Sequence, residues 1–233
     1  ILKIKIIYIN ANLKSDSYRL KRIFKGFSKW LFKKIDIIIV PSNEIKTRFS
    51  KNFQINHIKV LQDTRFIQIN HRIKKNREIK LSGLSTKPTI ILGSIDINDW
   101  EVAYQAIKSF QSINFNMIIV PHEIDDIFID KIYQDIKELN LSATRFTTIG
   151  NAENLDFIIY DKMGDLLDIY KYGKLAYVGC GFSKGVHNVV EPAIYGNTIC
   201  FGPNYHILNE AVEMVNNDLA FPVKSSDELS LIL

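Results

Sequence analysis

Residues 175–192 read LAYVGCGFSKGVHNVVEP, and this stretch decides how the chain is expected to fold. Its first four residues are apolar and suit a buried strand. The glycines Gly179, Gly181 and Gly185 follow, and helical spacing begins near Asn188. A buried strand that runs through a glycine-rich loop into a helix is the repeating unit of a parallel α/β sheet.

Strands and helices alternate on both sides of this stretch. Further strands are predicted at 4–9, 36–40, 58–61, 89–93, 116–120, 157–160, 198–201 and 220–223. Helices are predicted at 16–34, after a cap at Ser42 or Asn43, and at 99–111, 125–139, 164–172, 188–195, 207–216 and 227–233. We therefore expect an α/β protein with two Rossmann-like, doubly wound parallel-sheet domains, the first one incomplete.

The alternation fails between residues 69 and 87, where the sequence is polar, basic and aperiodic. Such composition is typical of a connection between domains. We predict a domain portion at 1–68, a linker at 69–87, and a second domain at 88–233 that is cut short at its end.

The net charge of +5 is too small to indicate nucleic-acid binding, but it is concentrated in one segment. Eight basic residues and one acid, Asp16, stand between Lys14 and Lys34, which suits an anionic partner such as a phosphate or a membrane surface. The same segment carries an apolar row at helical spacing: Ile23, Phe24, Phe27, Trp30 and Leu31. Helix 16–34 is therefore either packed on the sheet with a solvated basic rim, the interpretation we favour, or in contact with anionic lipid headgroups.

Cysteine and histidine spacing gives no sign of a metal. Cys180 and Cys200 form no CxxC pair, which fits a reducing cytoplasm. The five histidines have no ligand spacing: His57, His71, His122, His187 and His206. We expect no metal ion and no other cofactor.

Ligands of doubly wound sheets bind beyond the carboxyl ends of the strands. Glycines and a helix start suit a phosphate there, although for the glycines alone a tight turn that needs positive φ is the favoured interpretation. His187, Asn188 and Glu191 shift the balance towards a ligand site. The Glu191 carboxylate can accept hydrogen bonds from a ribose diol or simply complement the helix dipole. His187 is a base, a phosphate donor or a packing side chain.

The segments GVHNVVEPA (185–193) and YGNTICFGPN (195–204) closely resemble the lipid A Kdo (3-deoxy-D-manno-octulosonic acid) transferase family, whose members read GGHN or GIHN, then LEP or LEA, then GPN or GPH. Collinear matches are YDKMGDLLDIY (160–170), DTRF (63–66), NANL (10–13) and Pro121-His122. The resemblance runs from Ile7 to the C-terminus. It departs from the family where arginines are absent from NANL and from the Pro121-His122 pair, and after Leu92 only Ser94 carries over.

The resemblance implies a GT-B glycosyltransferase that is inverting and independent of metal. It would transfer Kdo from CMP-Kdo to a lipid A precursor (lipid IVA) in lipopolysaccharide biosynthesis, at the cytoplasmic face of the bacterial inner membrane. Segment 1–68 would belong to the acceptor domain, and 88–233 would bind the donor. The implied nucleotide-sugar-binding residues are Ser94, Pro121, His122, Met163, Gly164, Asp165, Gly181, Gly185, His187, Asn188 and Glu191.

The family's general base would lie upstream of Ile1, so no catalytic residue is assigned and the chain alone is expected to be inactive. Two alternatives stay open. One is another GT-B glycosyltransferase, or a sugar-nucleotide epimerase, that uses a UDP-sugar. The other is a nucleotide-binding module without catalysis.

Overall fold

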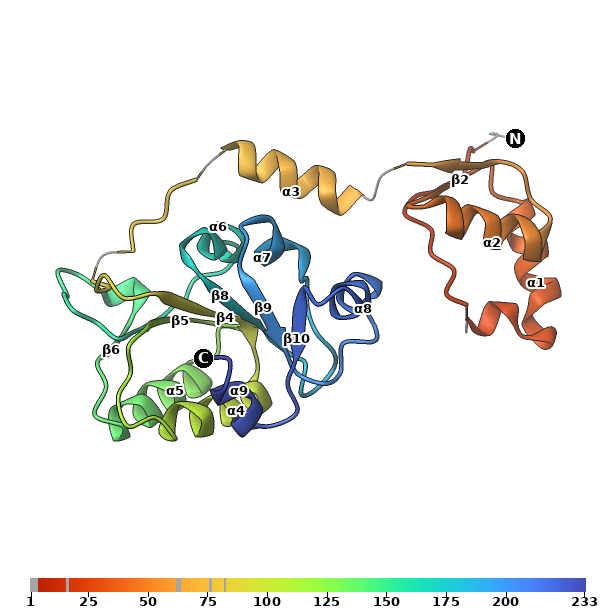
Figure 1. Cartoon of the computed structure of the whole chain (residues 1–233). Coiled ribbons are helices and arrows are strands. Elements are labelled where there is room, and N and C mark those ends of the chain that lie inside the picture. Colours follow the sequence, from red (N-terminus) through yellow and green to blue (C-terminus); the bar gives the residue numbers. More distant parts are fainter. Residues whose placement is uncertain (1–3, 16, 62–63, 76, 82) are drawn as a thin grey trace. The chain divides into compact units, whose positions relative to one another are not determined.

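The computed structural model describes residues 4–15, 17–61, 64–75, 77–81 and 83–233, and of residues 64 and 65 it describes the backbone alone. Asp16 and Asp63, both used in the sequence predictions, lie outside the described residues. The chain divides into two compact units, residues 1–75 and 76–233, called here the N-terminal and C-terminal units (Figure 1).

The N-terminal unit has a parallel sheet in the order β1-β2-β3, formed by Ile7–Tyr8, Ile37–Val40 and Ile58–Val60. Its helices are α1 (Arg22–Lys33), α2 (Asn43–Phe53) and α3 (Thr64–Lys75), with a 3₁₀ turn at Tyr18–Leu20. The expected cap is present, because the Ser42 hydroxyl accepts a hydrogen bond from the Ile45 N–H at 3.2 Å. The core is aromatic: the rings of Phe32, Phe49 and Phe53 are in mutual contact.

Helix α1 differs from the prediction in both length and orientation. It begins at Arg22, because Lys21 is in an extended conformation that ends the preceding turn. Its buried residues are Ser28 and Phe32, whereas Trp30 keeps 57% of its surface exposed. The expectation that the apolar row packs on the sheet is therefore wrong. Phe32 docks the helix against α2, and this leaves the apolar row exposed: Ile23, Phe24, Phe27, Trp30 and Leu31.

Helix α3 covers the beginning of the segment predicted to be irregular. Phe66, Ile69 and Ile73 recur at helical spacing there, a pattern that the many polar and basic neighbours obscured. Irregular structure was thus the wrong prediction for 69–75. The assignment of 69–87 as an interdomain linker stays a prediction.

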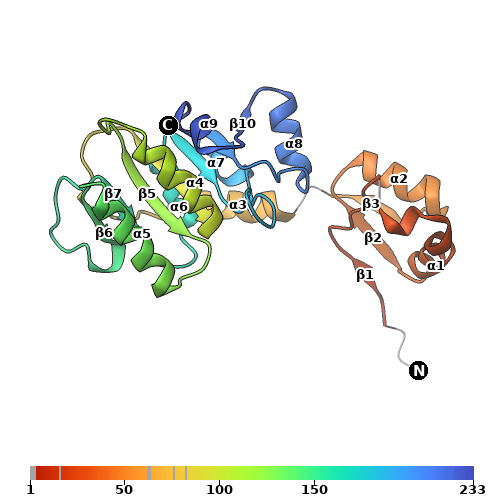
Figure 2. The same cartoon turned by 90° about the horizontal axis from the view of Figure 1, so that it is seen from below.

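The C-terminal unit has a parallel sheet in the order β10-β9-β8-β4-β5-β7-β6 (Figure 2). Its strands are β4 (Thr89–Ile95), β5 (Asn116–Pro121), β6 (Ala143–Arg145), β7 (Phe157–Ile159), β8 (Leu175–Val178), β9 (Thr198–Phe201) and β10 (Ala220–Pro222). Strands β8 and β9 have the predicted bounds, and the other predicted strands are confirmed with shifted ends. The short edge strand β6 was not predicted.

Helices cover both faces of this sheet, as expected for a doubly wound domain (Figure 1). One face carries α4 (Ile97–Lys108), α5 (Asp126–Glu138) and α9 (Ser226–Ser230). The other carries α6 (Leu166–Ile169), α7 (Val190–Ile194) and α8 (Asn209–Asn216). The larger core is built around Trp100 of α4, which is fully buried and donates its ring N–H to Asp135 at 2.7 Å.

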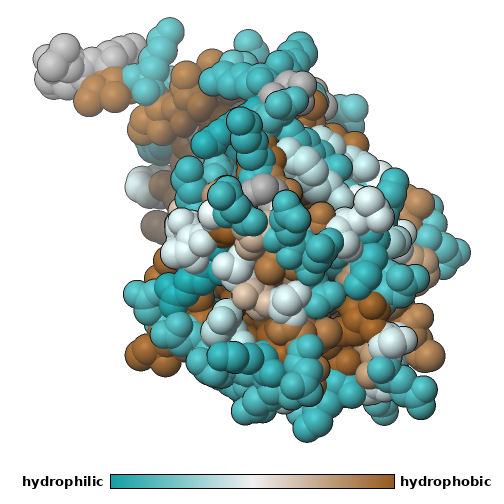
Figure 3. Space-filling model, turned by 90° about the vertical axis from the view of Figure 1, so that its left-hand side faces the viewer, coloured by the Kyte–Doolittle hydropathy of each residue, from teal (hydrophilic) through white to brown (hydrophobic). Residues whose placement is uncertain are grey.

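Figure 3 shows a face of the molecule on which hydrophilic residues dominate, with smaller hydrophobic areas between them. Within the described part of the chain, no helix has the length and apolar character needed to cross a membrane.

Candidate functional site

The central strand β4 lies between β5 and β8. The chain leaves β4 for β5 on one side and later returns to β8 on the other, so the strand order reverses between β4 and β8. Ligands of doubly wound sheets bind at such a reversal, beyond the carboxyl ends of the strands. A non-glycine residue with positive φ stands at the carboxyl end of each of these two strands: Ser94 (60°), at a register shift within the last residues of β4, and Cys180 (63°), in the loop after β8. Such strained backbone occurs most often at functional sites.

Asp99, in the first turn of α4, holds the β8 loop in place. Its fully buried carboxylate accepts hydrogen bonds from the Tyr177 hydroxyl at 2.7 Å and from the backbone N–H groups of Cys180 and Phe182 at 2.5 and 3.4 Å. Burial raises the pKa of Asp99 despite these bonds. Asp96 caps α4 and accepts a hydrogen bond from the Ser183 hydroxyl of the same loop.

Two histidines predicted for the site meet beside Cys180. The rings of His122 and His187 stack with centroids 4.4 Å apart. His122 Nδ1 lies 3.0 Å from Ser94 Oγ, and His187 Nε2 lies 3.1 Å from Cys180 Sγ. Burial, and secondly the neighbouring His122, lower the pKa of His187, which favours its neutral form. Burial raises the pKa of the Cys180 thiol to about 12, with Asp96 and Asp99 adding to the effect.

The predicted loop glycines have packing roles. A Cβ on Gly181 would stand 2.4 Å from the backbone nitrogen of Gly202, because the loops after β8 and β9 touch through their backbones. Asn204, within the GPN segment, donates its N–H to the Gly181 carbonyl at 2.9 Å. Gly185 has a φ of 115°, which disfavours any side chain. Packing thus explains both glycines, and their contact with a nucleotide stays a prediction.

Asn188 and Glu191 form one hydrogen-bonded pair at the start of α7. The Asn188 side chain accepts from the Val190 N–H at 3.0 Å and donates to Glu191 Oε1 at 3.2 Å. The helix therefore begins at Val190 rather than at Asn188 as predicted. Burial raises the pKa of Tyr170, and the charge of the nearby Glu191 adds to it.

The remaining predicted residues follow β5 and β7. Pro121 ends β5 and is buried, and Met163 is 64% exposed beyond β7, beside the exposed Gly164. Asp165 is buried and accepts hydrogen bonds from the Tyr160 hydroxyl at 2.7 Å and from Arg77 at 2.5 Å. Its carboxylate thus anchors the loop internally, and its contact with a nucleotide stays a prediction.

Three residues at the site were missed: Asp96, Asp99 and Cys180. Asp96 and Asp99 form a capping box at the start of α4, and a D-x-x-D spacing before an apolar run was the available signal. A cavity of about 400 Å³ opens beside Cys180 and His122. It is lined by Ile95, Asp96, Ile97, His122, Glu123, Asp125, Ile127, Phe128, Lys131, Cys180 and Lys184.

Two parallel α/β units, the second with a glycine-rich loop and polar side chains at its strand-order reversal, define the GT-B class of glycosyltransferase folds. Solved structures agree with this class. The C-terminal CMP-Kdo binding domain of WaaA from Acinetobacter baumannii matches with a TM-score of 0.56 and 17% identity, over 72% of this chain and 85% of that one. A glycosyltransferase from Rickettsia africae matches with a TM-score of 0.50 and 15% identity, over 92% of this chain and 56% of that one.

Sequence comparisons give the family. The family model described as 3-Deoxy-D-manno-octulosonic-acid transferase (kdotransferase) matches residues 2–68. The 3-deoxy-D-manno-octulosonic acid transferase of Aquifex aeolicus is 31% identical over 86% of this chain and 54% of its own length. That of Rickettsia bellii is 26% identical over 96% of this chain and 54% of its own length. The chain spans about half the length of these curated relatives, and it belongs to the Kdo transferase family.

Proposed function

We propose that the C-terminal unit binds CMP-Kdo and that the whole protein transfers Kdo to a lipid A precursor, with inversion and without a metal ion. The observation that carries this proposal is the gathering of Ser94, His122 and His187 at the point where the strand order reverses, with Glu191 in the first turn of the helix that follows the β8 loop. The relatives are named Kdo transferases, which suggests Kdo as the sugar. The similar domain from Acinetobacter baumannii is a CMP-Kdo binding domain, which suggests CMP-Kdo as the donor.

The polar groups at this site suit a nucleoside monophosphate as the leaving group. Negative charge develops on the phosphate as CMP leaves, and preorganised donors stabilise such charge. We assign the phosphate to Ser94, His122, His187 and the loop before α7. The hydrogen bond from Asn188 orients the Glu191 carboxylate, which would accept hydrogen bonds from the two ribose hydroxyls.

The donor sugar is an acid, so its carboxylate requires a cation or hydrogen-bond donors. Lys184 is exposed in the β8 loop and lines the cavity of about 400 Å³ beside His122. We assign the sugar to this cavity, with Lys184 as the group that faces its carboxylate. Met163 and Gly164 would take the cytosine from the loop beyond β7.

Calorimetry with CMP and with UDP on the 233-residue chain tests this function. We expect CMP to bind more tightly than UDP. Tighter binding of UDP would favour the alternative of a UDP-sugar glycosyltransferase or epimerase. Binding of CMP without transfer by any longer form of the protein would favour a nucleotide-binding module.

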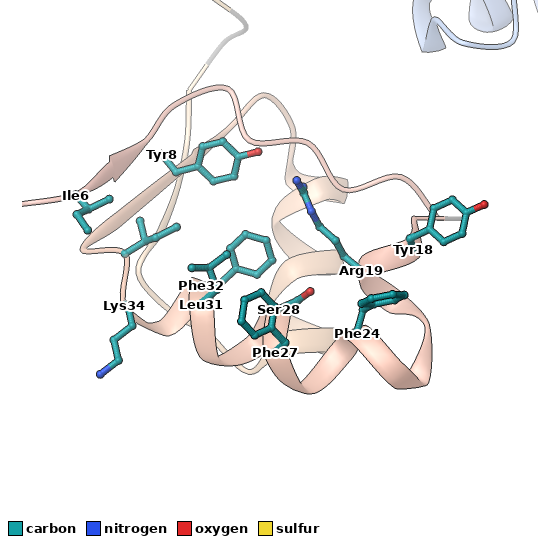
Figure 4. Close-up of a pocket in the computed structure, with 11 residues that line it drawn as sticks. Ile6, Tyr8, Tyr18, Arg19, Phe24, Phe27, Ser28, Leu31, Phe32 and Lys34 are labelled. Atoms are coloured by element: carbon teal, nitrogen blue, oxygen red, sulfur yellow. The ribbon is translucent and has the colours of Figure 1, made fainter.

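The N-terminal unit suggests where lipid would lie. A cavity of about 580 Å³ opens on the apolar side of α1 (Figure 4). The rings of Tyr8, Phe24 and Phe27 line it together with Arg19. Apolar side chains next to cations suit an acyl chain and an anionic headgroup. We propose that this surface meets the lipid A precursor at the cytoplasmic face of the inner membrane.

Vesicle sedimentation tests the membrane contact. The triple change Lys25→Glu, Lys29→Glu and Lys33→Glu should release the protein from vesicles that contain anionic lipid, with less effect at high salt. The matched control carries Lys162→Glu, Lys174→Glu and Lys224→Glu, which make the same charge change on the C-terminal unit. Equal binding of the two variants would contradict the proposal.

A further inference from the structure

We propose that His122, Cys180 and His187 form a binding site for a thiophilic divalent cation, Zn²⁺. One ring nitrogen of each histidine and the Cys180 sulfur all lie within 4.8 Å of one another. Among these atoms, His187 Nε2 lies 3.1 Å from Cys180 Sγ. This inference goes beyond the proposed function and departs from the expectation, based on residue spacing, that the protein binds no metal.

The three side chains are the ligand types that Zn²⁺ prefers. One thiolate and two imidazoles complete three corners of a tetrahedron and leave a fourth for water or another ligand. The sulfur ligand belongs to a residue that is only 3% exposed, whereas both histidines are partly exposed. An ion would therefore enter from the histidine side and meet the sulfur at the back of the site.

The surroundings hold two of the ligands in position. His122 Nδ1 is bonded to the Ser94 hydroxyl, and an imidazole that ligates a metal usually has such a partner on its other ring nitrogen. The Cys180 N–H is held by the buried carboxylate of Asp99. Ligands that are fixed in this way need little rearrangement when the ion arrives.

The nearby charges also favour a cation. Carboxylate oxygens of Asp96 and Asp99 lie within 4.8 Å of the Cys180 sulfur. Lys131 lines the adjoining cavity with its ammonium group paired to Asp135 at 2.8 Å. Lys184 lines the same cavity, and its positive charge opposes the binding of a cation.

The backbone conformation of Cys180 also supports a role for its thiol. Its φ of 63° is a conformation that glycine adopts freely and cysteine adopts only at an energetic cost. A cysteine held there, with its sulfur against His187, indicates that the thiol has a use at this position.

The transfer proposed above needs no metal, so the cation would have a separate role. Coordination would take up ring nitrogens of His122 and His187 that the proposed function gives to the donor phosphate. We therefore expect bound Zn²⁺ to weaken the binding of CMP.

Titration of the reduced 233-residue chain with Co²⁺, followed by displacement with Zn²⁺, tests the site without any nucleotide. We expect one equivalent of Co²⁺ to produce a thiolate-to-cobalt charge-transfer band that Zn²⁺ abolishes. Cys180→Gly should remove the band while the fold is kept, because glycine suits the positive φ. The matched control, Cys200→Ala, changes the other buried cysteine and should keep the band.

Two further variants and one control test the nitrogen ligands and the group that orients His122. His187→Gln should weaken Zn²⁺ binding, and His206→Gln, in the same unit, should not. Ser94→Ala removes the group that orients His122 and should weaken binding about 10- to 100-fold. The proposal is overturned if no charge-transfer band forms, or if the band persists in Cys180→Gly. Because the titration contains no nucleotide, a negative result would not contradict the proposed binding of CMP. The two proposals can therefore fail independently.

Discussion

The two units differ in how far their apolar side chains are buried. In the C-terminal unit, helices cover both faces of the sheet, and strands β4, β5 and β8 are almost entirely buried. In the N-terminal unit, α1 buries one aromatic ring and leaves Trp30 57% exposed. One unit thus presents polar groups at a sheet edge, and the other presents an apolar helix face.

This difference indicates different partners. A polar edge that is held by buried acids such as Asp99 suits a charged, water-soluble ligand. An uncovered apolar face next to lysines suits a lipid or another apolar surface. The following changes test the contrast, beginning with the largest expected effect.

The first change separates the buried and exposed faces of α1. Phe32→Ala should cost about 4 kcal/mol of stability in the N-terminal unit, because it removes a ring that packs on Phe49 and Phe53. Trp30→Ala, an equally drastic truncation two residues away, should change stability by less than about 1 kcal/mol. Urea unfolding followed by circular dichroism checks both. Similar losses would show that the exposed face is packed after all.

The second change removes the acid that holds the loop after β8. Asp99→Ala should cost about 3 kcal/mol, because the Tyr177 hydroxyl and two backbone N–H groups lose their acceptor while buried. Asp130→Ala removes an exposed carboxylate of α5 and should cost about 0.5 kcal/mol or less. A loss confined to Asp99→Ala in thermal unfolding would support the comparison, and equal losses would contradict it.

The third change addresses the ribose. Glu191→Gln keeps the shape but removes the charge, and hydrogen bonds to charged groups contribute about 1.5–3 kcal/mol. We expect CMP binding to weaken about 10- to 100-fold. Glu213→Gln on the exposed side of α8 serves as the matched control and should leave the affinity unchanged. If Glu191→Gln bound CMP with unchanged affinity, Glu191 would not contact the ribose.

The fourth prediction concerns pH. Because the pKa of His187 lies below its usual 6.5 in the folded state, the unfolded chain binds this proton more readily. Stability contributed by neutral His187 is therefore present above pH 6.5 and is lost as the pH falls below that value, by less than about 1.4 kcal/mol per pH unit. The C-terminal unit of His187→Gln should lose less stability between pH 7 and 5 than the original protein. An identical pH dependence of the two would contradict the shift.

The smallest expected effect distinguishes the sugar from the nucleotide. Lys184→Ala removes an exposed cation, and exposed ion pairs contribute about 0.2–1 kcal/mol. Binding of CMP-Kdo should weaken by about fivefold or less, while binding of CMP stays the same. An equal loss of affinity for CMP-Kdo and for CMP would show that Lys184 interacts with the phosphate rather than with the sugar.

The sequence predicted the C-terminal unit well because its signals are local. Buried strands such as Leu175–Val178 read as unbroken apolar runs, and glycines separate them from the helices. The N-terminal unit was harder. The apolar row of α1 predicted a helix correctly, but periodicity states only that such residues share a face, and not what covers it.

The sequence placed the candidate residues near the carboxyl ends of the strands, where the structure has them, but it did not predict the bonds between them. Histidines 65 residues apart in sequence, His122 and His187, meet because parallel strands end at one edge. Cys180 was judged by its distance from Cys200, so its contact with His187 went unnoticed. Asp165 was assigned to the nucleotide, although its carboxylate is bonded to Tyr160 inside the fold. Side-chain pairing of this kind depends on rotamers and loop geometry, which spacing along a chain does not encode.

The proposed nucleotide site lies in the loops at the strand-order reversal. The most direct test is titration of the ¹⁵N-labelled 233-residue chain with CMP, observed through its backbone amide resonances. We predict that the shifts concentrate at 93–95, at 122 and between 179 and 191, and that Glu191→Gln reduces them. Shifts that fall elsewhere, with these amides unmoved at saturation, would rule out this nucleotide site.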